Sequence, residues 1–424
     1  MASRNGPDYD APMRGAGDRL TIGERIAFYR RRRGLTQAVL AGLVGRSEDW
    51  LSKVERGERE IRRIDVLAEL AKALRVSLGD ILGRPVLAED DAQDDDVPAI
   101  RDALMNPRRL SRTLFSAPSV SPLLDLEPVR RRVEASWEAY QHGQVGRVVT
   151  ALPGLIGTAQ HLEDAAEDAD ADFERAAWSV SARTHHLAAT TLSKFGEADL
   201  GWIAAERAMQ AADRADDPLV LASAARAGTH ALLALGRFED AVVLGKAASA
   251  WLAAHLDDHD PAALSLYGML HLRTAVAAAR KQDRAMATEL IGVADDAARR
   301  LGRDANFWQT GFGPTNVELH RLSVALDLGD VAVVVDQGPA VRTENLPVER
   351  RVSHRIGVAR ALHMVARDED ALAMLLSAER EAPALVRHSP AVRETVKAMS
   401  RRAPVTGGRS SALFAFAERC RAVQ

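Results

Sequence analysis

The segment RSEDWLSKVERG, which covers residues 46–57, has the pattern of a short capped helix. Ser47 is a residue type that accepts hydrogen bonds from the first free N–H groups of a helix, and Gly57 is a type that ends one. Leu51 and Val54 are three positions apart, so both lie on one helical face. The segment therefore predicts a helix that buries this apolar face and exposes a charged one.

Four further helical patterns surround this segment. They cover residues 21–34, 36–44, 64–74 and 77–82, with apolar residues at helical spacing. Gly45 stands between the second pattern and the helix of residues 47–57, where the chain must turn sharply. Two helices joined across a short glycine turn, inside a five-helix globule, predict a helix-turn-helix domain.

The charge of this region differs in sign from that of the rest of the chain. Residues 19–84 contain 13 Arg and 2 Lys against 6 Glu and 3 Asp, a formal charge of +6. The whole chain of 424 residues has a net charge of −3, so the remainder carries −9. A basic module on an acidic body is expected of a protein that meets nucleic acid through one end.

The stretch GLTQAVLAGLVGRSEDWLSKVERGERE resembles the phage-repressor-like regulators of the xenobiotic-response-element family. In such domains the second helix of the motif lies in the major groove of DNA. The resemblance implies that Ser47, Glu48, Asp49, Ser52 and Lys53 face the bases, that Gln37 touches the DNA backbone or a flanking base, and that Arg46, Arg56 and Arg59 meet phosphates. The arginine run of residues 30–33 is a further candidate for phosphate contact, although four arginines at a helix C-terminus also complement the helix dipole.

Glu48 and Asp49 have two interpretations. The N-terminus of a helix carries a partial positive charge and favours carboxylates, so both residues could be purely structural. Alternatively, a carboxylate can accept a hydrogen bond from cytosine N4 and repel a wrongly placed phosphate. The sequence leaves both interpretations open, and with them the identity of the DNA target.

Beyond about residue 128 the chain is a series of Ala- and Leu-rich helical patterns without strand alternation. The stretch LGRFEDAVVLGKAASA places Gly236, Phe238, Ala241, Gly245 and Ala248 at offsets 0, 2, 5, 9 and 12. Small residues at offsets 0, 5 and 12 allow the two helices of a hairpin to approach closely. Weaker copies of this frame start at Gly143, Gly196, Gln282, Gly329 and Ala366.

The frame resembles the tetratricopeptide pattern of small and aromatic residues. Successive copies start 37 to 53 residues apart, which exceeds the ~34 residues of a regular tetratricopeptide. The predicted fold class is therefore all-α, with a five-helix phage-repressor-like helix-turn-helix domain followed by an irregular tetratricopeptide-like α-solenoid. Aromatic residues make up only 4% of the chain, which also favours helix over sheet.

Four segments are expected along the chain. Residues 1–18 read as a disordered tail, residues 19–84 as the DNA-binding domain, residues 85–127 as an acidic linker and connector, and residues 128–424 as the helical sensor and dimerisation domain. The linker contains AEDDAQDDDV at residues 88–97, whose carboxylates repel one another.

The chain has one cysteine, Cys420, so an intramolecular disulfide is excluded and a reducing cytoplasm is expected. The N-terminal residues lack the apolar core of a signal peptide, and no uncharged apolar run approaches the ~20 residues of a membrane span. The sequence shows no catalytic or metal-binding motif, so we expect no enzyme activity, no cofactor and no metal.

Residues 306–330, NFWQTGFGPTNVELHRLSVALDLGD, gather aromatic residues in a chain that has few. Asn316 and His320 share a helical face, where an amide and an imidazole could hold a peptide backbone or a polar small molecule. The alternative is that the aromatics fill the core and Asn316 braces a neighbouring loop. The predicted ligand-binding residues are Asn316, His320, Trp308, Phe312, His271, Arg273 and Tyr267, with His230 and Trp251 as further candidates.

This C-terminal region also looks like that of a group of regulators from high-GC bacteria, which join the same helix-turn-helix to a tetratricopeptide-like sensor domain. The resemblance implies a dimeric, sequence-specific transcriptional regulator that binds double-stranded DNA and responds to a peptide or small-molecule effector. The alternative is a protein-interaction scaffold or antitoxin-like partner whose DNA binding serves only autoregulation.

Overall fold

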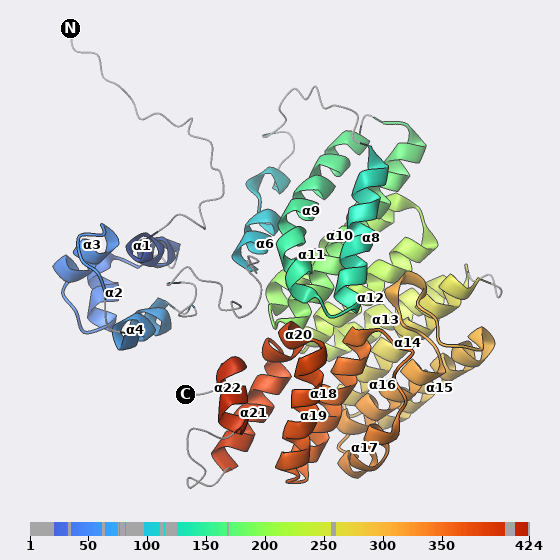
Figure 1. The fold of residues 1–424 in the computed structure, drawn as a ribbon. Helices are drawn as coiled ribbons and strands as arrows, with labels where there is room; N and C mark the ends of the chain where they lie inside the picture. The colour runs from blue at the N-terminus through green and yellow to red at the C-terminus, as the bar shows by residue number, and fades with distance from the viewer. Residues whose placement is uncertain are drawn as a thin grey trace. The chain divides into compact units, whose positions relative to one another are not determined.

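The computed structural model describes residues 21–32, 35–61, 64–74, 76, 81, 97–110, 114, 125–167, 169–255, 260–402 and 412–422. Every regular element in these ranges is a helix, which confirms the all-α prediction. The chain divides into two compact units, Met1–Ala99 and Ile100–Gln424, called below the N-terminal unit and the helical body. Figure 1 shows the helices of both units.

The N-terminal unit contains α1 (Ile22–Arg32), α2 (Gln37–Leu43), α3 (Glu48–Glu55) and α4 (Ile64–Leu74). Its core is built from the apolar faces of these helices, with Ile26, Leu40, Leu51 and Leu70 fully buried. The predicted fifth helix, residues 77–82, lies outside the described residues except for Ile81, which is helical and buried.

Both helices of the motif begin at a capping side chain, as the sequence predicts for Ser47. The Thr36 side chain accepts a hydrogen bond from the N–H of Val39, and the Ser47 side chain accepts one from the N–H of Trp50. Gly45 has a φ of 63°, a left-handed conformation that glycine adopts without steric cost, so α2 can turn directly into α3. The predicted N-terminal tail and the acidic stretch of residues 88–96 lie outside the described residues.

From residue 125 onward, the described part of the helical body forms six antiparallel helical hairpins followed by three shorter helices. The hairpins are α8 (Leu126–Gln141) with α9 (Val145–Ala166), α10 (Ala171–Lys194) with α11 (Ala198–Ala215), α12 (Pro218–Ala234) with α13 (Phe238–Ala253), α14 (Pro261–Arg280) with α15 (Arg284–Leu301), α16 (Pro314–Asp327) with α17 (Val331–Gln337), and α18 (Val348–Met364) with α19 (Asp368–Glu381). They are followed by α20 (Pro383–Arg387), α21 (Pro390–Arg402) and α22 (Ala412–Arg419). Three 3-10 turns also belong to the chain: η1 (Pro107–Arg109), η2 (Phe307–Gln309) and η3 (Gly338–Ala340).

Each copy of the sequence frame starts at the turn inside one hairpin. The second helix of the hairpin begins two residues after each frame start, at the position of the second frame residue. All six frame starts have positive φ, between 61° and 87°, including the two that are not glycine, Gln282 and Ala366. The frame therefore marks a left-handed residue that lets the chain reverse between two helices.

Small residues set the distance between neighbouring helices in the body. A Cβ atom on Gly245 of α13 would collide with Thr274 of α14, and one on Gly268 of α14 would collide with the ring of Phe312. Both glycines are buried, so the side chain of the facing element fills the space that they leave.

The first helices of the six hairpins form an inner row in which each contacts the next, in the order α8, α10, α12, α14, α16, α18. The row closes, because α18 also contacts α8, and α20 contacts α9. The turn at Gly143 takes part in this closure, since a Cβ there would collide with Ala382. The inner helices thus surround a central space, which contains the cavity described below.

Part of the predicted connector packs on the body. Helix α6 (Val97–Leu104) buries Ile100 and Leu104, and Arg101 forms a 3.1 Å ion pair with Glu197. Arg109 of η1 lies 3.2 Å from Glu163, which also accepts a hydrogen bond from Ser181. Burial raises the pKa of Glu163, but His185, Arg109 and Ser181 outweigh it and lower that pKa to about 2.

Among the described residues, no helix is long and apolar enough to cross a membrane. The same residues contain no group of three or more His, Cys, Asp or Glu side chains placed to hold a metal ion. Cys420 is a buried free thiol.

Candidate functional site

Helix α3 presents one face to solvent and one to the core. Leu51 and Val54 are buried, as the spacing predicts, and Glu55 is buried beside them. The other face carries the residues that the sequence assigns to DNA. Of these, Arg46, Ser47, Glu48, Asp49, Arg56 and Arg59 are exposed, and Ser52 and Lys53 are half-buried.

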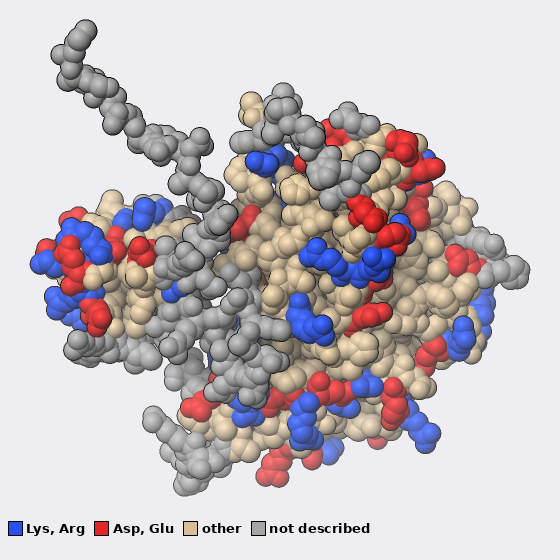
Figure 2. Space-filling view, turned by 45° about the horizontal axis from the view of Figure 1, so that its top comes forward, with Lys and Arg blue, Asp and Glu red and all other residues tan. Residues whose placement is uncertain are grey.

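The cations on this face are held by weak, exposed ion pairs. Lys53 lies 2.8 Å from Asp49 one turn away, and Arg56 lies 2.8 Å from Glu58. The hydrogen bond from Lys53 lowers the pKa of Asp49. Figure 2 shows Lys and Arg interleaved with Asp and Glu on the face of this unit that is in view. Exposed pairs contribute at most about 1 kcal/mol, so a DNA phosphate can replace either carboxylate at little cost.

Arg46 lies directly before the helix, with its guanidinium 5.6 Å from the centre of the Trp50 ring. Trp50 is half-buried and packs on the edge of the core. A stacked guanidinium loses less side-chain freedom on binding than a free one. Arg46 is thus partly ordered at the N-terminal end of α3.

Gln37 is engaged inside the unit. Its amide donates a 2.7 Å hydrogen bond to the carboxylate of Glu55, and Arg30 donates two more to the same group at 2.6 and 2.8 Å. The Glu55 side chain is 5% exposed and that of Arg30 is 12% exposed. This network ties α1 and α2 to α3, so Arg30, which the sequence groups with the candidate phosphate contacts, serves the fold. Sequence reasoning missed Glu55 because it reads as one more surface acid.

We expect the substitution Glu55→Ala to destabilise the N-terminal unit by about 3 kcal/mol. It removes the carboxylate that Arg30 and Gln37 share and leaves a buried guanidinium without a counter-charge. Amide hydrogen exchange of the full chain, read for residues 21–61, should show a large loss of protection. The control Glu58→Ala removes an exposed partner of Arg56 and should change protection by less than about 0.5 kcal/mol. Equal protection in the two variants would contradict this role for Glu55.

The helical body contains an open cavity of about 580 Å³. Its walls come from the inner helices α10, α12, α14, α16 and α18, and from α21. A smaller chamber adjoins it, and the two share His230, Arg273 and Arg350. A cavity of this size is typical of sites for small ligands.

Three of the predicted ligand-binding residues line this cavity: Asn316, His320 and Arg273. His230 lines it as well. Asn316 is fully buried, and its amide nitrogen lies 3.3 Å from the carbonyl of Thr310, while its Oδ1 has no hydrogen-bond partner among the described residues. The Nδ1 of His320 lies 2.9 Å from the carbonyl oxygen of Asn316. Asn316 therefore does both things that the sequence analysis considered: it braces a neighbouring loop and it lines a cavity.

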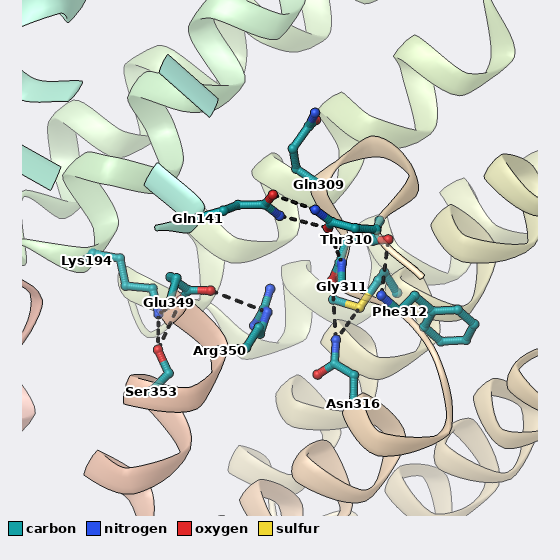
Figure 3. A network of polar contacts seen from close by, with 12 residues as sticks. Gln141, Lys194, Gln309, Thr310, Gly311, Phe312, Asn316, Glu349, Arg350 and Ser353 are labelled. Atoms are coloured by element: carbon teal, nitrogen blue, oxygen red, sulfur yellow. Dashed lines mark hydrogen bonds and ion pairs between the residues drawn. The ribbon is translucent and has the colours of Figure 1, made fainter. Parts of the chain in front are cut away.

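The four other predicted ligand-binding residues do not line the cavity. Phe312 is fully buried in the socket left by Gly268, and Figure 3 shows its ring pointing away from Asn316. The guanidinium of Arg183 stacks over Trp308, 4.8 Å from the centre of the Trp308 ring. Tyr267 and His271 pack edge to face on each other, with ring centres 4.5 Å apart. The further candidate Trp251 is exposed, and its ring lies 4.3 Å from that of His255.

Several charged residues of the cavity were missed by sequence reasoning. Figure 3 shows Lys194 and Ser353 meeting at Glu349, whose carboxylate lies 2.6 Å from the Lys194 ammonium. Burial raises the pKa of Glu349, but the charges of Lys194 and Arg350 outweigh it and hold that pKa well below its usual range. Arg226 and Arg350 line the smaller chamber. The one available signal was an arginine inside an otherwise apolar helix, as in the AARAG of α12.

Comparison with known proteins assigns the N-terminal unit. Residues 21–81 match a family model described as a helix-turn-helix domain. The chain thus carries such a domain, with α2 and α3 as the two helices of the motif. The comparison with curated proteins finds no match. Among solved structures, PlcR of Bacillus thuringiensis in complex with the peptide PapR7 and DNA is similar at 14% identity and a TM-score of 0.26, over 66% of this chain and 95% of the PlcR chain. A likeness at that score does not establish a shared fold.

Proposed function

We propose that this protein is a sequence-specific DNA-binding transcriptional regulator. The observation that carries the proposal is the outward face of α3 in a domain that matches the helix-turn-helix family. In such domains this face meets base edges, and the proposal gives that role to Ser47, Glu48, Asp49, Ser52 and Lys53. Arg46, Arg56 and Arg59 flank this face and contact phosphates. A regulator of this kind acts in the cytoplasm, where bacterial DNA lies.

The regulator acts as a homodimer. A single short recognition helix reads only a few base pairs, and helix-turn-helix dimers read two half-sites about one helical turn apart. The helical body supplies the contact between the two copies. Its cavity, which contains Asn316, His320 and Arg273, takes an effector that shifts the population of DNA-competent dimers.

The proposal is tested by selecting bound sequences from a random double-stranded DNA library with the full chain. We expect an inverted repeat whose half-sites are centred about 10 base pairs apart. Light scattering of the purified protein should give a particle of twice the 45.9 kDa chain mass. A library that shows no enrichment would remove the DNA-reading role. Stoichiometric copurification of another protein, without enrichment of DNA, would favour the scaffold or antitoxin-like alternative.

A further inference from the structure

The cavity of the helical body carries an excess of positive charge. Of the described residues that line its two chambers, Glu349 is the only carboxylate. The cations that line them are Lys194, Arg226, Arg273, Arg280 and Arg350. Lys194 is paired with Glu349, and Arg280 with Asp327 outside the cavity. The guanidinium groups of Arg226, Arg273 and Arg350 therefore have only Glu349, already paired with Lys194, as a carboxylate among the described lining residues.

Two of these guanidinium groups form no ion pair with any described residue. Arg226 is 6% exposed, and its polar contacts are long: 3.4 Å to the carbonyls of Gln309 and Trp308, and 3.3 Å to the ring of His186. Arg273 forms no ion pair or hydrogen bond with any described residue. The Nε atoms of both arginines are buried and have no hydrogen-bond partner in the described part of the chain.

The electrostatic cost of this arrangement is visible in the pKa values. Burial and the charges of Arg350 and Arg273 lower the pKa of Arg226 to about 9, and burial and Arg350 lower that of Arg273 to about 10. Both groups remain charged at neutral pH. Buried charges are normally paired, because desolvation without a partner is expensive. An anion in the cavity would supply the missing partner.

We propose that the cavity binds a small molecule through an anionic group, a carboxylate or a phosphate, held by Arg273, Arg226 and Arg350. Arg273 and Arg350 line both chambers, and Arg226 lines the smaller one beside them. An anion bound between Arg273 and Arg350 therefore also experiences the positive charge of Arg226. Leu233, Val276 and Leu319 line the larger chamber and receive the apolar part of such a molecule. This inference rests on the proposed function, for which it names the chemical class of the effector.

The test uses the full chain and two probes, inorganic phosphate and succinate, each titrated against chloride at constant ionic strength. We expect saturable stabilisation of the wild-type body, seen as a rise in its unfolding temperature. Stabilisation by one probe alone identifies which anionic group the cavity prefers. The absence of saturable stabilisation by either probe overturns the proposal.

The variant Arg273→Gln separates an anion site from a structural arginine. In chloride alone its unfolding temperature should not fall, because the substitution removes an unpaired buried charge that repels Arg226 and Arg350. Its affinity for the stabilising probe should fall at least tenfold. Arg303→Gln, at an exposed position with the same charge change, should titrate like the wild type. A lowered unfolding temperature in chloride, or an unchanged affinity for the probe, contradicts the proposal.

The same experiment distinguishes a failure of the anion site from a failure of the DNA-binding role. The wild-type protein is titrated with the selected DNA as well as with the stabilising probe. If the wild type binds DNA but no anion, only the anion site is wrong. If it binds the anion but no DNA, the regulator proposal is wrong and the anion site remains.

Discussion

Replacing Arg46, Lys53 and Arg56 together with alanine should reduce the affinity for DNA by roughly 10²- to 10³-fold at physiological salt. All three lie on or beside the outward face of α3, and none is part of the core. Arg46 and Arg56 are the proposed phosphate contacts of this set, and each such contact releases condensed counterions, so the magnitude of the slope of log affinity against log salt should also fall by about 1.8. Affinity is measured by fluorescence anisotropy with the selected DNA, from about 50 to 200 mM salt.

A matched control removes the same charge from the body. Arg237, Arg299 and Arg367 are exposed, and each pairs with an aspartate three or four residues away, so their triple replacement by alanine should leave DNA affinity and salt slope unchanged. The variant Asp49→Asn adds a second control, because it releases Lys53 and removes a repulsive carboxylate. We expect it to bind unrelated DNA several-fold more tightly than the wild type. Equal losses in the two triple variants would show that the binding is a general effect of charge.

Lowering the pH from 7.5 to 5.5 should reduce the free energy of unfolding of the helical body by more than about 1 kcal/mol. His186, His271 and His320 are each less than 10% exposed, and burial lowers the pKa of all three, that of His271 to about 4. In the unfolded chain they titrate near 6.5, so below that pH the unfolded state binds protons that the folded state does not. Their contribution is complete above pH 6.5 and is lost as the pH falls toward the folded pKa. For His271 this loss is about 1.3 kcal/mol by pH 5.5.

Urea denaturation of the full chain at several pH values measures this loss. His271→Asn should reduce the difference in the free energy of unfolding between pH 7.5 and 5.5 by about 1.3 kcal/mol. The control His142→Asn, at an exposed position, should retain the wild-type difference. Stability that does not change between these pH values would contradict neutral burial of the three histidines.

Much of the fold could be predicted because its signals are local. Thr36, Ser47 and Gly45 set the caps and the turn of the N-terminal unit through contacts within a few residues. The frame in the body likewise marks a local event, the left-handed residue between two helices of a hairpin. It is for this reason that degraded copies, such as the one at Gln282, still lie at a turn.

The cavity was less accessible from the sequence because its residues come from distant helices. Arg226, Arg273 and Arg350 lie on α12, α14 and α18, and they meet only because the inner row of helices closes on α8. Asn316 could be found because its partner His320 lies one turn away on the same helix. Phe312 was predicted to bind ligand but is buried in the core. The sequence could not show this, because the space that its ring fills is left by Gly268 on another helix.

The central claim is that α3 reads a DNA sequence, and the ratio of specific to non-specific affinity tests it most directly. The full chain is titrated with the selected DNA and with an unrelated duplex of the same length, at the same salt concentration. A sequence-specific regulator should bind the selected DNA at least about 10³-fold more tightly. Affinities within a factor of ten of each other would contradict the claim.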